Sequence, residues 1–272
     1  MDILSRPQCR SLYPGEKLLR IALTRQVSPS IVHCELTYLE REPIDVELAV
    51  RQHDEYEGLL RTLGCRIQRL RPEPDLPDSV FVEDVAVVLD SRAVITRPGA
   101  ASRSTETRTA EEALRPHRTL SHIEAPGTMD GGDVLTVGKR IYVGLSHRTN
   151  AAAVEQLGAV LKEEGFSVVG VPLDKCLHLK TGVTRVAEAT LLLNPEWVDA
   201  ATFPGMKILE VDPDEPFACN GLLVQDSVIF PREFPHTAAR LEREGIRVVP
   251  VGFSELAKAE AGVTCCSVIF EA

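Results

Sequence analysis

The feature that most constrains the fold of this chain is a hairpin pattern that recurs along its length. In four segments hydrophobic residues alternate along the chain, and a short polar turn breaks each segment near its middle, as in β-hairpins. These segments are residues 84–96, 133–145, 183–194 and 221–231. A fifth pair can be assembled from the two chain ends, with residues 265–270 beside residues 20–25. The sequence therefore predicts five strand pairs of one kind.

A helical segment and one further strand follow each pair. Apolar residues recur at helical spacing in 46–63 and 149–164, and Gly64 and Gly165 mark the ends of these helices. Residues 236–245 form a similar segment, residues 195–205 a shorter one, and a capping box from Thr109 to Glu112 predicts the start of another. The strands that follow are predicted at 65–70, 118–126, 166–173, 206–211 and 246–253. The repeating unit is thus ββαβ, with a period of roughly 40–50 residues that is typical of blade-like repeats.

Five equivalent units whose terminal halves pair with each other predict a closed ring, because closure removes exposed sheet edges. The residues that precede the first strand of each unit would then converge near the ring axis. These positions are polar in all five units, although each of them leads into a core strand. They are Asp78, Glu83 and Asp84; Asp130 and Asp133; His178; Asn220; and Cys265.

Composition narrows the classes of function. The net charge is −10, which disfavours nucleic acid or an anionic membrane as a partner. No apolar stretch is long enough to cross a membrane, and no secretion signal begins the chain. Seven cysteines without framework spacing favour reduced thiols in a cytoplasm. No C-x-x-C pair, paired histidine motif or P-loop is present, so neither a metal nor an organic cofactor is predicted.

Six segments, taken in order, closely resemble the dimethylarginine dimethylaminohydrolases. They lie at residues 77–88, 95–103, 128–135, 143–150, 177–180 and 264–268. The family belongs to the guanidine-modifying superfamily, so the resemblance implies an α/β fold that is a five-bladed propeller with pseudo-five-fold symmetry, in one domain. It also implies a small guanidino compound as substrate, and it is compatible with a homodimer.

The resemblance implies a role for nine residues. Cys265 matches the nucleophile, His178 the general acid/base, and Asp130 its carboxylate partner. Asp84 matches the carboxylate that holds the guanidinium, and Glu83 lies in the same substrate-lining motif. Asp78 matches a contact to the α-amino group, Arg103 and Arg148 contacts to the α-carboxylate, and Val27 a position beside the substrate.

These residue types suit the chemistry of a guanidinium group. Its central carbon is a poor electrophile, which a thiolate attacks far better than water does, and the product is a covalent thiouronium intermediate. One histidine can protonate the leaving amine and then deprotonate the water that resolves the intermediate. Carboxylates accept hydrogen bonds from the cation, and arginines bind the far carboxylate in bidentate fashion. Citrulline is the expected product.

Two segments are expected to lie outside the repeat. Residues 27–44 carry two prolines and follow the first strand, where the family has a mobile loop over the active site, while residues 1–18 are expected to be an N-terminal extension. The loop differs from the family pattern, which leaves open a deiminase of free arginine or another guanidino compound. An alternative of another class is a non-catalytic arginine-binding or regulatory module.

Overall fold

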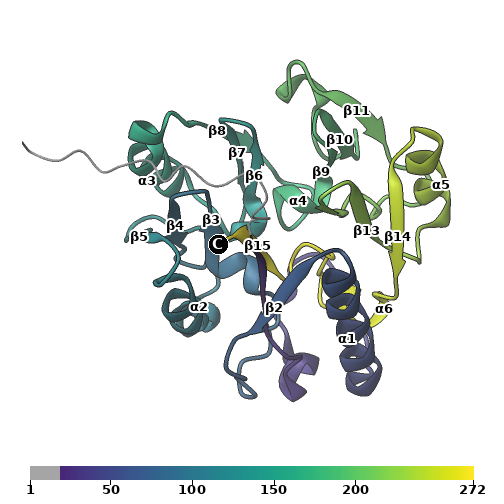
Figure 1. Ribbon diagram of the computed structural model, residues 1–272, viewed down its shortest axis with the longest axis horizontal. Helices are drawn as coiled ribbons and strands as arrows, with labels where there is room; N and C mark the ends of the chain where they lie inside the picture. The colour runs from purple at the N-terminus through teal and green to yellow at the C-terminus, as the bar shows by residue number, and fades with distance from the viewer. Residues whose placement is uncertain (1–18) are drawn as a thin grey trace, which may run out of the picture.

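The computed structural model describes residues 19–272 and arranges them in five three-stranded sheets around a common axis (Figure 1). In each sheet the middle strand pairs antiparallel with the first strand and parallel with the third. The sheets consist of β15 (Val268–Glu271), β1 (Arg20–Thr24) and β2 (Cys65–Arg69); β3 (Ala86–Val88), β4 (Arg92–Ile95) and β5 (Thr119–His122); β6 (Val134–Val137), β7 (Arg140–Leu145) and β8 (Ser167–Pro172); β9 (Val183–Ala187), β10 (Thr190–Leu193) and β11 (Lys207–Glu210); β12 (Leu222–Val224), β13 (Ser227–Pro231) and β14 (Arg247–Val251). The predicted five-bladed ring is confirmed.

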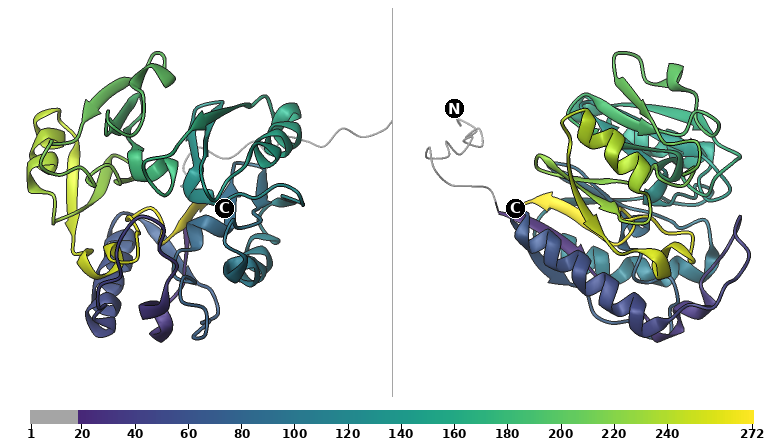
Figure 2. Two further views of the ribbon diagram at one scale, coloured as in Figure 1. Left: turned by 180° about the vertical axis from the view of Figure 1, so that it is seen from behind. Right: turned by 90° about the vertical axis from the view of Figure 1, so that its right-hand side faces the viewer.

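The two chain ends close the ring, as the sequence predicts. β15 pairs with β1 so that Phe270 lies opposite Ile21 and Val268 opposite Leu23. Both views of Figure 2 show these terminal strands side by side. One expectation is wrong: β15 begins at Val268, and Cys265 therefore lies in the turn before the strand. The extension predicted for residues 1–18 lies outside the described residues.

Helices connect the middle strand of each sheet to its parallel neighbour, because parallel strands need a crossover. These connections are α1 (Val46–Thr62), α2 (Thr107–Leu114), α3 (Ala151–Leu161), α5 (Pro235–Arg243) and the short 3₁₀ helix η6 (Ala200–Thr202). Gly64, Gly165 and Gly245 follow three of the helices with positive φ, which is the conformation that glycine tolerates at a helix end. Within residues 19–272, no helix is long and apolar enough to cross a membrane.

The predicted capping box of α2 is wrong. The 3₁₀ helix η3 (Ala101–Glu106) runs directly into α2, which begins at Thr107 without a side-chain cap. Thr109 is therefore inside the helix and buried, and its hydroxyl accepts a hydrogen bond from the Arg25 guanidinium.

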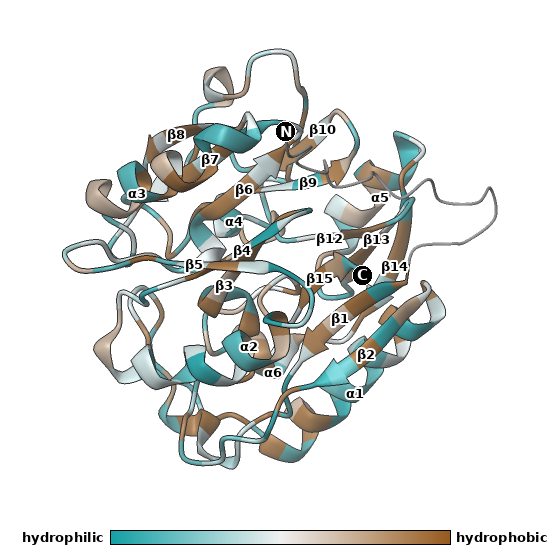
Figure 3. Cartoon of the chain, turned by 60° about the vertical axis from the view of Figure 1, so that its left-hand side comes forward, coloured by the Kyte–Doolittle hydropathy of each residue, from teal (hydrophilic) through white to brown (hydrophobic). Residues whose placement is uncertain are grey.

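The hydrophobic core lies between the sheets and the helices outside them. One cluster, for example, joins Ile21 and Leu23 of β1 to Ile95 of β4 and Leu114 of α2. Figure 3 shows hydrophobic residues concentrated along the strands, while much of α1 is hydrophilic. The shorter elements lie at the ends of the strands: η1 (Pro29–His33), η2 (Val82–Val85), η4 (Gly131–Asp133), η5 (Lys162–Glu164), α4 (Leu179–Gly182) and α6 (Ser254–Ala257). Three of these, η2, η4 and α4, bring polar residues to the axis, where the candidate site lies.

Candidate active site

A small, largely enclosed cavity forms where the segments before the inner strands converge. It holds about 20 Å³, little more room than a water molecule needs. Six of the residues predicted to converge or to bind substrate line it: Asp78, Asp84, Arg103, Arg148, His178 and Cys265. Asp130 is fully buried behind them. The convergence that the repeat predicts is therefore present for Cys265, His178, Asp78 and Asp84, whereas Asn220 lines a neighbouring cavity instead.

His178 and Asp130 form a buried pair. His178 lies at the start of α4, and its Nε2 is 3.1 Å from Asp130 Oδ2. Asp130 is held from the other side, because its Oδ1 accepts a hydrogen bond from the Gly99 backbone nitrogen. Burial alone would lower the pKa of His178, but Asp84 and Asp130 outweigh that effect and raise its pKa to about 9. The imidazole is therefore protonated at neutral pH and can donate a proton to a leaving group.

Asp84 lies on the opposite side of the imidazole. Its Oδ1 is 3.9 Å from His178 Nδ1 and accepts a hydrogen bond of 3.0 Å from the Gly132 backbone nitrogen. Its Oδ2 accepts from Arg103 Nη1 at 2.6 Å. Burial alone would raise the pKa of this carboxyl, but the positive charges of His178 and Arg103 lower it. Asp84 is thus an ionised carboxylate beside the cavity, suited to a cationic substrate.

Cys265 supplies a buried thiol to the same cavity. The Gly262 backbone nitrogen lies 3.4 Å from its Sγ, and the Glu83 backbone nitrogen donates to its carbonyl oxygen at 3.0 Å. Burial, together with the charges of Glu83 and Asp84, raises the pKa of this thiol well above its usual range. The neighbouring Cys266 is fully buried in the hydrophobic core and does not line the cavity. A cation bound beside Asp84 would oppose the negative charges and favour the thiolate of Cys265.

Asp78, Arg103 and Arg148 also line the cavity. The Asp78 carboxylate accepts from the Glu35 backbone nitrogen at 3.1 Å, and Arg148 Nη2 donates to Thr37 Oγ1 at 3.3 Å. Arg103 differs, because all three of its nitrogens already donate to protein oxygens, chiefly those of Asp84 and Glu106. Because Nη1 carries two hydrogens and makes one hydrogen bond, to Asp84, its second N–H is the donor that could contact a substrate carboxylate.

Two residues predicted to contact substrate lie elsewhere. The Glu83 side chain points away from the catalytic cavity, where its carboxylate pairs with Lys180 Nζ at 2.6 Å and accepts from Thr264 Oγ1 at 2.7 Å. Val27 is packed in the hydrophobic core and lines a separate cavity beside His53. The chain passes Val27 before η1 begins, so it is Glu35, later in the loop, that reaches the catalytic cavity.

Other polar residues hold the site in place. Asp133 is fully buried and accepts from Ser146, Thr149 and the Leu179 backbone nitrogen, so it anchors the residue after His178 rather than facing the cavity. The sequence gave little indication that Glu106 belongs to the site. Its carboxylate pairs at 2.8 Å with Arg103, which lies three residues earlier in the chain. Lys180 could have been suspected only from its place two residues after His178.

The side chains of Asp84, Asp130 and His178 could also converge on a metal ion, since one ligand atom of each lies within 4.8 Å of the others. Protein donors already occupy their carboxylate oxygens, however: Gly132 and Arg103 on Asp84, and Gly99 and His178 on Asp130. Each carboxylate oxygen retains a second lone pair, which can accept the N–H donors that a guanidinium offers.

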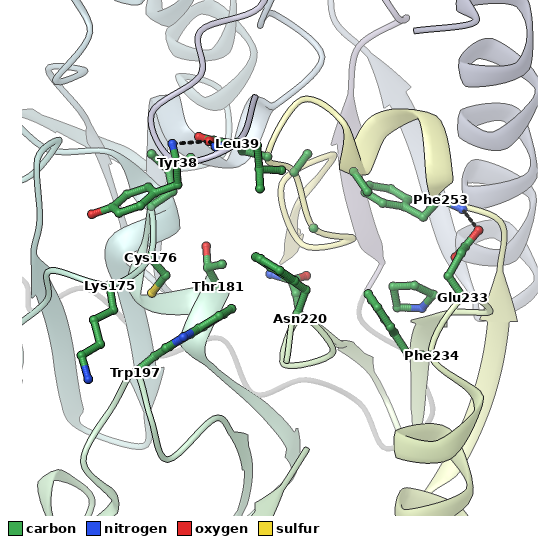
Figure 4. A pocket seen from close by; sticks show the side chains of 17 residues that line it. Tyr38, Leu39, Lys175, Cys176, Thr181, Trp197, Asn220, Glu233, Phe234 and Phe253 are labelled. Atoms are coloured by element: carbon green, nitrogen blue, oxygen red, sulfur yellow. Dashed lines mark hydrogen bonds between the residues drawn. The ribbon is translucent and has the colours of Figure 1, made fainter. Parts of the chain in front are cut away.

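A larger cavity of about 460 Å³ adjoins the catalytic one and shares Leu177, Glu260 and Ala261 with it. Figure 4 shows Tyr38 and Leu39 at one side of this cavity and Phe234 and Phe253 across from them. Its lining is largely aromatic and aliphatic. Its two carboxylates, those of Glu233 and Glu260, accept hydrogen bonds from backbone nitrogens of Phe253 and of residues 37–39.

Comparison with known proteins identifies close relatives. Residues 73–215 match the family model for arginine deiminase. The chain is 40% identical over 229 residues to the N(G),N(G)-dimethylarginine dimethylaminohydrolase of Pseudomonas aeruginosa, which covers 83% of this chain and 90% of that protein. It is 42% identical over 249 residues to the protein of the same name from Streptomyces coelicolor, covering 91% and 95%. The solved structure of the Pseudomonas aeruginosa protein, a mutant complexed with citrulline, superposes with a TM-score of 0.89 at 38% identity and covers 93% of this chain and 100% of that one.

Proposed function

Because the chain belongs to the dimethylarginine dimethylaminohydrolase family, we propose that it hydrolyses Nω-methylated arginine to citrulline and the corresponding methylamine. The observation that carries the proposal is the convergence of Cys265, the His178–Asp130 pair and Asp84 on one buried cavity. These residues come from segments that precede inner strands of four different sheets. A site for binding alone has no need of a nucleophile beside a protonated imidazole.

The first half of the reaction forms a covalent intermediate. The guanidinium binds beside Asp84, and its positive charge favours loss of the Cys265 proton to water. The thiolate attacks the central carbon and forms a C–S bond. His178, protonated in the resting site, gives its proton to the methylated nitrogen. The C–N bond breaks, the methylamine leaves, and a cationic thiouronium remains on Cys265.

The second half returns the enzyme to its starting state. Neutral His178 takes a proton from water as the oxygen attacks the thiouronium carbon. The C–S bond then breaks, and the departing sulfur takes up the proton that the product releases. Citrulline leaves, and His178 is protonated again. The buried Asp130 stabilises the imidazolium at both ends of this cycle.

The remaining polar residues fit the amino-acid end of the substrate. Asp78 is proposed to accept hydrogen bonds from the α-amino group. Arg148 is proposed to donate to the α-carboxylate, together with the second N–H of Arg103 Nη1. We also propose that the protein acts in the cytoplasm on this small molecule and not on nucleic acid. The six described cysteines are all free thiols, as a reducing compartment requires.

The test is citrulline formation from asymmetric dimethylarginine, monomethylarginine and arginine. Cys265→Ser should abolish turnover on every substrate, whereas the matched variant Cys266→Ser should keep it, since Cys266 does not reach the cavity. If kcat/KM is highest on arginine, the proposal is wrong and the protein is a deiminase. If none of the three substrates is turned over but binding is retained, the protein is a non-catalytic binding module.

A further inference from the structure

Glu260 binds the loop that contributes Glu35 to the lining of the catalytic cavity. Its carboxylate accepts hydrogen bonds from three consecutive backbone nitrogens, those of Thr37, Tyr38 and Leu39, the first at 3.0 Å. Bonds from N–H groups to a carboxylate are stronger than those between neutral groups. One side chain therefore fixes the backbone of a whole loop segment that lies more than 200 residues away in the sequence.

The backbone at Glu260 adopts a conformation that its residue type disfavours. Its φ is +57°, in the left-handed region that usually requires glycine. Among the described residues, Gln225 is the other non-glycine with positive φ, and it lies in the tight turn between β12 and β13. Strain of this kind persists where the surrounding structure imposes it, often at functional sites.

The loop held by Glu260 touches the residues proposed to bind the amino-acid end of the substrate. Thr37 accepts from Arg148 at 3.3 Å, and the Glu35 backbone nitrogen donates to Asp78 at 3.1 Å. Two outer contacts support the same segment: the Tyr38 hydroxyl donates to the Asp174 carbonyl oxygen, and its ring packs against His147. The positions of the Asp78 and Arg148 side chains thus depend on where this loop lies.

Glu260 also stands between two cavities. It lines the catalytic cavity and the larger one, whose rim carries Tyr38 and Leu39 (Figure 4). If the segment 37–39 moved away, the hydrogen bond from Arg148 to Thr37 would be lost. The neighbouring Glu35, whose backbone nitrogen donates to Asp78, would lose its support.

We propose that Glu260 is a positioning residue for substrate binding, which acts by holding residues 37–39 so that Asp78 and Arg148 face the amino-acid end of the substrate. The inference rests on the proposed function, since it takes the substrate to be an α-amino acid. Glu260 takes no part in the chemical step, because its carboxylate binds the loop and not the reacting groups.

The test compares Glu260→Gly and Glu260→Gln with the parent enzyme on dimethylarginine. Glycine removes the carboxylate and its three hydrogen bonds but also relieves the backbone strain, which offsets part of the lost stability, and the thermal unfolding midpoint checks that the variant is folded. If the loop is then correctly placed in only a tenth of the molecules, KM rises about tenfold while kcat stays within about twofold. Glutamine keeps one acceptor oxygen and should raise KM by less.

Gln225→Gly is the matched control. It relieves the same positive φ at a hairpin that is not part of the cavity, so it should leave both KM and kcat unchanged. An unchanged KM in Glu260→Gly would overturn the proposal, and so would a fall in kcat at constant KM.

Binding measured without turnover separates this inference from the proposed function. In a Cys265→Ser background, calorimetry should show about tenfold weaker citrulline binding when Glu260→Gly is added. If the parent is inactive but the added Glu260→Gly substitution still weakens citrulline binding, the proposed reaction is refuted and the role of Glu260 is supported. If the parent is active and the Cys265→Ser variant binds citrulline equally well with and without the added Glu260→Gly substitution, only the proposed role of Glu260 is refuted.

Discussion

A methyl group added at Gly132 would press against His178 and Asp84, the two groups proposed to act on the substrate guanidinium. The Cβ of alanine at this position would lie 2.6 Å from His178 Nδ1 and 2.9 Å from Asp84 Oδ1. Ordinary contact begins near 3.4 Å, so the imidazole must move by about 0.8 Å, and a misplacement near 1 Å costs about 100-fold in rate. Gly132→Ala should therefore lower kcat/KM on dimethylarginine by about two orders of magnitude.

The assay is citrulline release at saturating and limiting substrate, together with the thermal unfolding midpoint. Overpacking of this size costs about 1–3 kcal/mol of stability, so the variant should remain folded at the assay temperature. Gly58→Ala is the control, because nothing lies within 4 Å of the added carbon in the interior of α1. It should keep full activity and gain up to about 1 kcal/mol of stability. A kcat/KM of Gly132→Ala within threefold of the parent value would refute the geometry inferred for His178 and Asp84.

Three further predictions follow from the charges around the cavity. Asp130→Asn removes a carboxylate 3.1 Å from His178, so the pKa of His178 should fall. The alkaline limb of the pH profile of kcat/KM should then move to lower pH, and an unmoved limb would contradict the pairing. Glu106→Gln leaves the buried Arg103 with one carboxylate partner fewer. The free energy of unfolding measured in urea should fall by about 2 kcal/mol, and an unchanged value would contradict the ion pair. The stabilisation from His178 is complete below pH 6.5 and lost as pH rises through about 9, because its pKa is raised in the folded state. Unfolding free energies measured between pH 6.5 and 9 should therefore decline, and they should decline less in His178→Gln.

Much of this protein could be predicted from the sequence because its signals are local. Strand alternation, helical spacing and the glycines after α1, α3 and α5 depend on residues close in the chain, and they predict five ββαβ units. The repeat then implies that polar residues before the inner strands meet at one axis. His178, Asp84 and Cys265 do so. The resemblance to a family adds their chemical roles, which the repeat alone does not contain.

Tertiary structure decided what depends on contacts between distant segments. Glu83 and Asp84 are neighbours in sequence, but η2 turns their side chains in different directions. Glu83 pairs with Lys180 outside the catalytic cavity, whereas Asp84 faces His178. The capping box at Thr109 failed because η3 leads into α2 without a break. Glu260 reaches the loop at 37–39 only because the ring closes between the chain ends. Hydrogen bonds across such separations leave no periodic trace in the sequence, and the partners of a carboxylate are therefore set by the packing that brings them together.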